Sequence, residues 1–172
     1  YIVCKPFNVK VLPPQLPLKA VSPVEVLPGI LHAVDLAKID QTKNVLIMGQ
    51  GVSGLLMTQA VALSNPKNLV VTDLYDKNLE LAKRYGATHT YKLPAHDAKT
   101  ADFVKKDFPD GFDIVIPCLL EGNGVVDAID MAAVCGRSVL YGCIGVCSIP
   151  IDFFRFHRKR LELYSTEPRR DI

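Results

Sequence analysis

From residue 43 onward, short continuous apolar runs alternate with segments that carry apolar residues at helical spacing. The runs lack the two-residue alternation of a half-exposed strand, so they predict strands that are covered on both faces. The segments between them predict helices that pack on a sheet. The predicted strands are 44–48, 69–73, 89–92, 112–116, 137–141 and 161–164, and the predicted helices are 52–63, 76–85, 98–108, 124–134 and 153–156.

Strands and helices that alternate through short connections form right-handed βαβ units on a parallel sheet. The pattern therefore predicts an α/β fold with a doubly wound parallel sheet. The length of 172 residues suits one such domain with a small appendage.

The first 21 residues contain four prolines, which predicts an extended lead-in without regular elements. A helix is then expected to begin with Ser22 as its N-cap, Pro23 at its first position and Glu25 three residues after the cap. Pro28 should break or restart this helix. The chain opens at Tyr1 without Met, which we interpret as a piece of a longer protein.

Composition narrows the classes of function. Hydrophobic residues make up 49% and charged residues 22%, which is typical of a soluble globular domain. The net charge of +2 gives no reason to expect a nucleic-acid partner, and the apolar runs are too short for a membrane partner. Five widely spaced cysteines indicate reduced thiols, so we expect a cytoplasmic protein.

A glycine-rich loop joins the first predicted strand to its helix. Its first glycine permits a tight turn, its second lets a pyrophosphate approach the backbone, and its third lets the helix pack closely on the strand. Free N–H groups at the helix start would hold the phosphates of a dinucleotide. The loop residues predicted to bind cofactor are Gly49, Gln50, Gly51, Val52, Ser53 and Gly54.

An acid ends the second predicted strand at the distance that a dinucleotide site requires. Asp73 follows the last loop glycine by about 20 residues, where a carboxylate accepts hydrogen bonds from the adenosine ribose and repels a 2′-phosphate. Leu74 comes next, with no Arg beside it, which favours NAD over NADP. The alternative is that 49–54 is only a tight turn and Asp73 a solvated acid.

With these residues in place, the chain resembles the medium-chain, zinc-type alcohol and polyol dehydrogenases, including sorbitol and threonine dehydrogenases. The resemblance rests on the glycine loop, Asp73 and the stretches 25–33, 79–87 and 136–142. It implies that 22–172 is a dinucleotide-binding domain with the Rossmann fold. It also implies that 1–21 is the remnant of a zinc-binding catalytic domain.

The resemblance further implies cofactor contacts at the carboxyl ends of later strands. Two residues after the fourth strand would line the adenine and ribose side, although buried filler is the better interpretation of the cysteine side chains. Residues after the fifth and last strands would lie at the nicotinamide. These residues are Cys118 and Leu119, then Gly142, Cys143 and Ile144, and finally Ser165 and Thr166.

Two positions carry particular expectations. Glu25 lies 24 residues before Gly49, where polyol-dehydrogenase relatives place a Glu at the catalytic zinc; the other interpretation is a capping-box partner of Ser22. The family often has Lys or Arg five positions after the acid, whereas this chain has Asn78, which should weaken a ribose or phosphate contact.

As a member of that family, the intact enzyme would transfer hydride between an alcohol or polyol substrate and NAD, with zinc as Lewis acid. This chain alone would bind NAD and catalyse nothing. An exposed sheet edge at 146–150 would pair copies into a homo-oligomer. Three alternatives remain: a zinc-free NADPH quinone or enoyl reductase, a regulatory nucleotide-sensing domain, and a methyltransferase.

Overall fold

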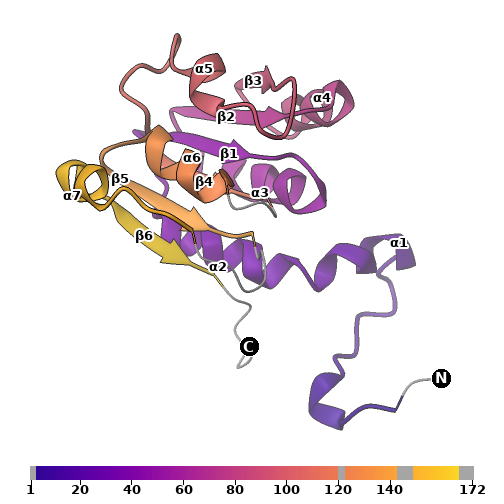
Figure 1. Ribbon diagram of the computed structural model, residues 1–172. Helices are drawn as coiled ribbons and strands as arrows, with labels where there is room; N and C mark the ends of the chain where they lie inside the picture. The colour runs from indigo at the N-terminus through magenta and orange to yellow at the C-terminus, as the bar shows by residue number, and fades with distance from the viewer. Residues whose placement is uncertain (1–2, 120–122, 143–148, 167–172) are drawn as a thin grey trace.

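The computed structural model describes residues 3–119, 123–142 and 149–166. Its centre is a six-stranded sheet in the order β3-β2-β1-β4-β5-β6, and every neighbouring pair is parallel (Figure 1). This arrangement is the Rossmann fold, so the predicted fold class is confirmed. The strands are β1 Asn44–Met48, β2 Asn68–Asp73, β3 His89–Lys92, β4 Phe112–Pro117, β5 Ala132–Leu140 and β6 Glu162–Ser165.

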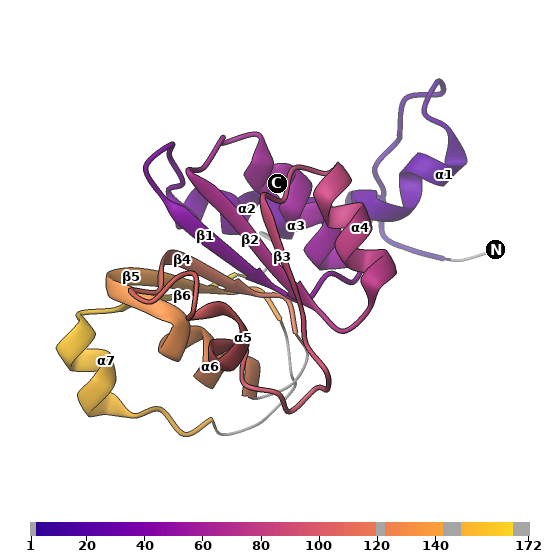
Figure 2. The same cartoon turned by 90° about the horizontal axis from the view of Figure 1, so that it is seen from above.

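Helices cover both faces of the sheet. Figure 2 shows α2, α3 and α4 on one face, and α5, α6 and α7 on the other. The core is divided in the same way into two clusters of buried side chains. These helices are α2 Leu27–Ala37, α3 Val52–Ala62, α4 Asp76–Arg84, α5 Thr100–Val104, α6 Asn123–Met131 and α7 Phe153–Lys159.

Strand β1 shows why its apolar run is continuous. Val45 and Ile47 belong to the cluster under α2 to α4, whereas Leu46 and Met48 belong to the cluster on the opposite face. Successive side chains of a strand point to opposite faces, and here both faces are buried. All four residues are at most 1% exposed.

Strand β5 begins earlier than predicted. Helix α6 ends at Met131, and Ala132 already pairs with Phe112 of β4. The strand register then shifts, and Cys135 adopts a positive φ of 60°. Gly136, predicted to follow the end of a helix, therefore lies inside a bulged strand, where glycine often marks a bulge.

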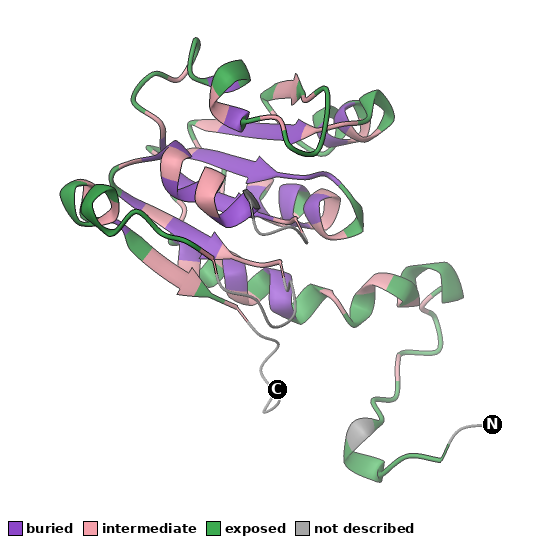
Figure 3. Cartoon of the chain, in the orientation of Figure 1, coloured by how far each residue is buried: buried purple, intermediate pink, exposed green. Residues whose placement is uncertain are grey.

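The N-terminal segment departs from the prediction. It contains a short 3₁₀ helix (η1, Pro6–Asn8), helix α1 (Leu18–Val21) and a second 3₁₀ turn (η2, Ser22–Val24). Ser22 has helical angles, φ −53° and ψ −44°, so it cannot cap a helix as an extended residue does. The predicted capping box of Ser22 and Glu25 is therefore wrong. Figure 3 shows this segment mostly exposed.

Within the described ranges, no single helix is long and apolar enough to cross a membrane. One bent pair, Leu18–Val24 with Leu27–Ala37, meets the criterion only by length and composition. The second helix of that pair buries Ile30, Ala33 and Ala37 in the core of the sheet domain.

Candidate cofactor site

The order of the strands reverses between β1 and β4, because β2 continues the chain on one side of β1 and β4 lies on the other. In doubly wound sheets ligands bind at such a switch point, outside the carboxyl ends of the strands. Two cavities lie there, one on each side of the glycine loop that follows β1.

Two glycines of the loop are required by its geometry. Gly49 has φ +86°, in the left-handed region that favours glycine. A Cβ on Gly54 would lie 1.9 Å from the carbonyl oxygen of Gly49, which no side chain can accommodate without movement of the backbone. By contrast, a Cβ on Gly51 would meet no described residue within 4 Å apart from its neighbours in the chain. The loop is thus closed against α3 and open at Gly51.

Helix α3 begins at this opening. Gly51 is its N-cap, no side chain caps it, and its first turn carries no acid. The first N–H groups of any helix have no intrahelical acceptor, and here no side-chain cap takes their place. Together with the helix dipole, these N–H groups favour a bound anion. The adjoining cavity, of about 250 Å³, is lined by Gly51, Val52, Ser53, Gly54, Cys118, Tyr141 and Gly142.

The carboxylate of Asp73 accepts three hydrogen bonds from its surroundings. Its Oδ2 accepts the main-chain N–H of Gln50 at 2.6 Å. Its Oδ1 accepts the main-chain N–H of Tyr75 at 2.8 Å and the side-chain amide of Asn78 at 3.1 Å. Asn78 thus contacts the acid itself, a role that the sequence did not predict.

Asp73 faces the larger cavity, of about 320 Å³. The predicted residues that line it are Gly49, Gly51, Asp73, Leu74, Asn78, Cys118 and Leu119. The sequence missed Thr72, Tyr75, Leu93, Ala95 and His96. Because β3 lies beside β2, the residues after its carboxyl end approach Asp73, and the rule used for the other strands would have found Leu93.

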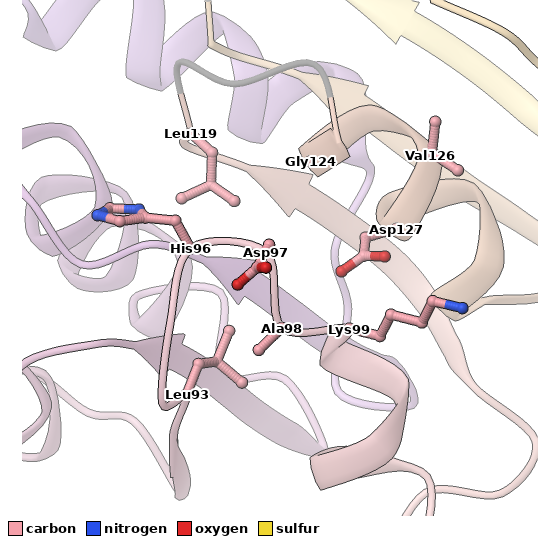
Figure 4. Close-up of a pocket in the computed structure, with 9 residues that line it drawn as sticks. All are labelled: Leu93, His96, Asp97, Ala98, Lys99, Leu119, Gly124, Val126 and Asp127. Carbon is pink, nitrogen blue, oxygen red and sulfur yellow. The ribbon is translucent and has the colours of Figure 1, made fainter.

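A third cavity, of about 220 Å³, adjoins the larger one and shares Leu93, His96 and Leu119 with it. Figure 4 shows Leu93 and Leu119 on opposite sides of the loop that carries His96, with the Lys99 amine directed away from Asp97 and Asp127. Asp127 also accepts the main-chain N–H of Thr100 at 3.0 Å, at the start of α5.

Two ionisable side chains of these cavities stay uncharged at neutral pH: Cys118, which lines the cavities on both sides of the glycine loop, and Tyr141, which lines the smaller of the two. Burial raises the pKa of the Cys118 thiol to about 12. Burial also raises the pKa of Tyr141, against the effect of a hydrogen bond to Ser53. The neutral thiol agrees with the interpretation of Cys118 as a packing residue.

The remaining predicted cofactor residues have different positions. The side chain of Gln50 is fully buried, so it faces the protein interior. Ser165 ends β6 and Thr166 donates its N–H to the carbonyl of Leu140, but neither residue lines the cavities on either side of the glycine loop. Cys143 and Ile144 lie outside the described residues, as do 146–148 of the predicted oligomer edge.

Glu25 is exposed and follows η2. In the parts of the chain that the structure describes, no three His, Cys, Asp or Glu side chains are grouped to hold a metal ion. These residues by themselves do not fit a zinc site, and the role of Glu25 stays a prediction.

A Rossmann sheet with a glycine loop and an acid at the second strand is typical of dinucleotide-binding proteins. Residues 51–167 match the family described as zinc-binding dehydrogenase. This match covers more than half of the chain, which therefore belongs to that family.

Among its curated relatives is galactitol 1-phosphate 5-dehydrogenase of Escherichia coli K12, 33% identical over 132 residues, which are 77% of this chain and 37% of the relative. L-threonine 3-dehydrogenase of Cutibacterium acnes is 30% identical over 111 residues, or 64% of this chain and 32% of that protein. The crystal structure of the E. coli galactitol-1-phosphate dehydrogenase superimposes with a TM-score of 0.79 at 26% identity, covering 97% of this chain and 49% of that one. The chain thus spans less than half the length of these relatives.

Proposed function

We propose that this chain is the NAD-binding domain of a dehydrogenase that acts on an alcohol or polyol. The observation that carries the proposal is the placement of Asp73 beside the glycine loop, in one cavity at the switch point of the sheet. NAD, when bound, would accept or supply the hydride of the reaction. The names of the relatives support the substrate class.

Each part of the site has a defined task in this proposal. The open face of Gly51 and the first N–H groups of α3 bind the pyrophosphate. Asp73 accepts a ribose hydroxyl and repels the 2′-phosphate of NADP. The cavity of Ser53, Tyr141 and Gly142 receives the nicotinamide half and keeps it among uncharged groups.

The substrate would be bound elsewhere, since the described residues provide a cofactor site and no metal cluster. We therefore expect this chain by itself to bind NAD and to oxidise no alcohol. The proposed domain comprises 22–172, with Glu25 as the one residue of this chain near a zinc ion. Pairing of two copies through 146–150 also stays a prediction.

The test is a titration of the 172-residue chain with NADH and NADPH, followed by the emission of the reduced nicotinamide. We expect saturable NADH binding, tighter than NADPH binding by about tenfold or more, as expected for a charge-assisted hydrogen bond of ~1.5–3 kcal/mol. In Asp73→Ala the preference should disappear, and in Asp73→Asn the affinity for NADPH should rise because the repelling charge is gone.

Asp113→Ala is the matched control. Asp113 also accepts a main-chain N–H, from Asn44 at 2.8 Å, but at the opposite end of the sheet. Its removal should leave the preference for NADH unchanged. Tighter binding of NADPH by the unaltered chain would favour the reductase alternative, and binding of S-adenosylmethionine alone would favour a methyltransferase.

A further inference from the structure

Gln50 is a fully buried polar residue in the glycine loop. Its side-chain Nε2 donates to the carbonyl oxygen of Gly49 at 3.1 Å, and its Oε1 accepts the hydroxyl of Thr58 at 2.8 Å. Thr58 lies on α3 and is also fully buried. Buried polar groups are costly unless they are hydrogen-bonded, so each of these side chains depends on the other.

These bonds hold the peptide unit between Gly49 and Gln50 at both ends. Its carbonyl oxygen accepts Gln50 Nε2, and its N–H donates to Asp73 Oδ2. The same carbonyl lies where a Cβ of Gly54 would be, beneath the first turn of α3. The orientation of this one peptide therefore decides whether its N–H points at the acid.

The hydrogen bonds of Asp73 show which of its oxygens can still bind a ligand. A carboxylate offers roughly two acceptor positions on each oxygen. Among the residues that the structure describes, Oδ1 already accepts two donors, from Tyr75 and Asn78, whereas Oδ2 accepts only the N–H of Gln50. The remaining acceptor position is thus on Oδ2, the oxygen that the Gly49–Gln50 peptide orients.

We propose that Gln50 and Thr58 form a buried clamp that positions the Asp73 carboxylate for the cofactor. Gln50 is then a positioning residue that acts through the loop peptide, although its side chain touches no ligand. The inference rests on the proposed function, because it concerns how the same site selects a ribose. It predicts that a change beneath α3 alters the choice between NADH and NADPH.

The binding test uses Gln50→Met, which keeps the length of the side chain without its amide, and Thr58→Val, which removes only the hydroxyl. We expect Gln50→Met to bind NADH about tenfold more weakly and to show a smaller preference over NADPH. Thr58→Val should have a smaller effect in the same direction. The double variant should bind no more weakly than Gln50→Met, since both changes break one unit.

Gln59→Met is the matched control, because Gln59 lies on the same helix with its side chain exposed and bonded to Leu55 O at 3.1 Å. It should bind both nucleotides as the unaltered chain does. Urea unfolding identifies any variant that is not folded, and Thr58→Val then carries the test. A folded Gln50→Met chain with unchanged NADH affinity and preference would overturn the clamp.

A second measurement needs no ligand. Hydrogen exchange of the amide at position 50 should be slow in the unaltered chain and about tenfold faster in Thr58→Val, while the amides of β1 keep their protection. Unchanged exchange at this amide would contradict the clamp. If the unaltered chain binds neither nucleotide, the proposed function fails, and the exchange result still decides whether the clamp exists.

Discussion

Both ends of the sheet carry a cavity, but the charged side chains that line the two cavities differ in number and in their hydrogen bonds. The cavity at the amino end, of about 250 Å³, is lined by five charged residues: Lys38, Lys43, Asp113, Arg137 and Glu162. Among the described residues that line the larger cavity, at the carboxyl end, Asp73 is the one carboxylate. A count of charges would therefore select the amino end as the binding site.

Most of the charged side chains at the amino end already have partners within the fold. Arg137 donates to Glu162 Oε2 at 2.6 Å and to the carbonyl of Leu36 at 2.7 Å. Asp113 accepts the N–H of Asn44. At the carboxyl end, in the part of the chain that the structure describes, Asp73 keeps an acceptor position and the start of α3 has no side-chain cap. The hydrogen-bonding capacity that remains, rather than the number of charges, distinguishes a binding site from a structural one.

The largest loss of stability and of NADH binding should come from a side chain added at Gly54, in the loop at the carboxyl end of the sheet. In Gly54→Ala the new Cβ would lie 1.9 Å from Gly49 O and 2.8 Å from Gly49 C, so the backbone of the loop must move. We expect a loss of at least about 3 kcal/mol in the free energy of unfolding, measured in urea, together with loss of NADH binding. Unaltered stability would mean that the loop is not closed against α3.

Gly51→Ala is the matched comparison at the open face of the same loop, where no described residue beyond the chain neighbours lies within 4 Å of the new Cβ. Its stability should fall by less than about 1 kcal/mol, because only a modest capping preference is lost. Its affinity for NADH should nevertheless fall clearly, since the methyl group occupies the space proposed for the pyrophosphate. Tight NADH binding by this variant would place the phosphates elsewhere.

An intermediate loss of stability should come from a substitution at the amino end of the sheet. Arg137→Met removes the partner of Glu162 and of the Leu36 carbonyl, so we expect about 1–3 kcal/mol of destabilisation in urea. The affinity for NADH should change less than twofold. Lys83→Met, which breaks the exposed pair with Glu80, should cost below about 0.5 kcal/mol. A large loss of NADH affinity in Arg137→Met would remove the distinction between the two ends.

The smallest effect concerns the cysteines of the two ends. Cys118 keeps its proton at pH 8 because burial raises its pKa to about 12, whereas Cys135 at the amino end is exposed. Since thiolates react and thiols do not, iodoacetamide should modify Cys135 about tenfold faster than Cys118. Peptide mass spectrometry measures both rates, and equal rates would contradict the burial of the Cys118 thiol.

The raised pKa of Cys118 also makes the free energy of unfolding depend on pH. A thiol in the unfolded chain ionises near its ordinary pKa of about 8.5, whereas the folded Cys118 stays neutral up to about pH 12. The neutral Cys118 thiol therefore makes its full contribution to the free energy of unfolding below pH ~8.5. This contribution is lost as the pH rises toward 12, because the thiol of the unfolded chain releases its proton first. Between pH 9 and 11, Cys118→Ala should lose stability less steeply than the unaltered chain.

Much of the fold could be predicted because the signals are local. The β1 run ends at Gly49, the loop places glycine where φ is positive, and His89–Lys92 is a strand with the predicted bounds. The predictions from the sequence were wrong where the fold of the whole chain decides the local structure. Pairing of Ala132 with Phe112 extends β5 backward, and the helical conformation of Ser22 removes a cap that the sequence pattern favoured.

The sequence by itself determined the α/β class, the order of the elements and the pairing of a glycine loop with an acid, because periodicity and turn chemistry are properties of neighbouring residues. Only the tertiary structure decided what surrounds that acid. The bonds of Asp73 to Gln50 and Asn78, and the burial of Gln50 against Thr58, join the loop after β1 to β2, α3 and α4. Such contacts depend on how the chain packs, and no local pattern of residues records them.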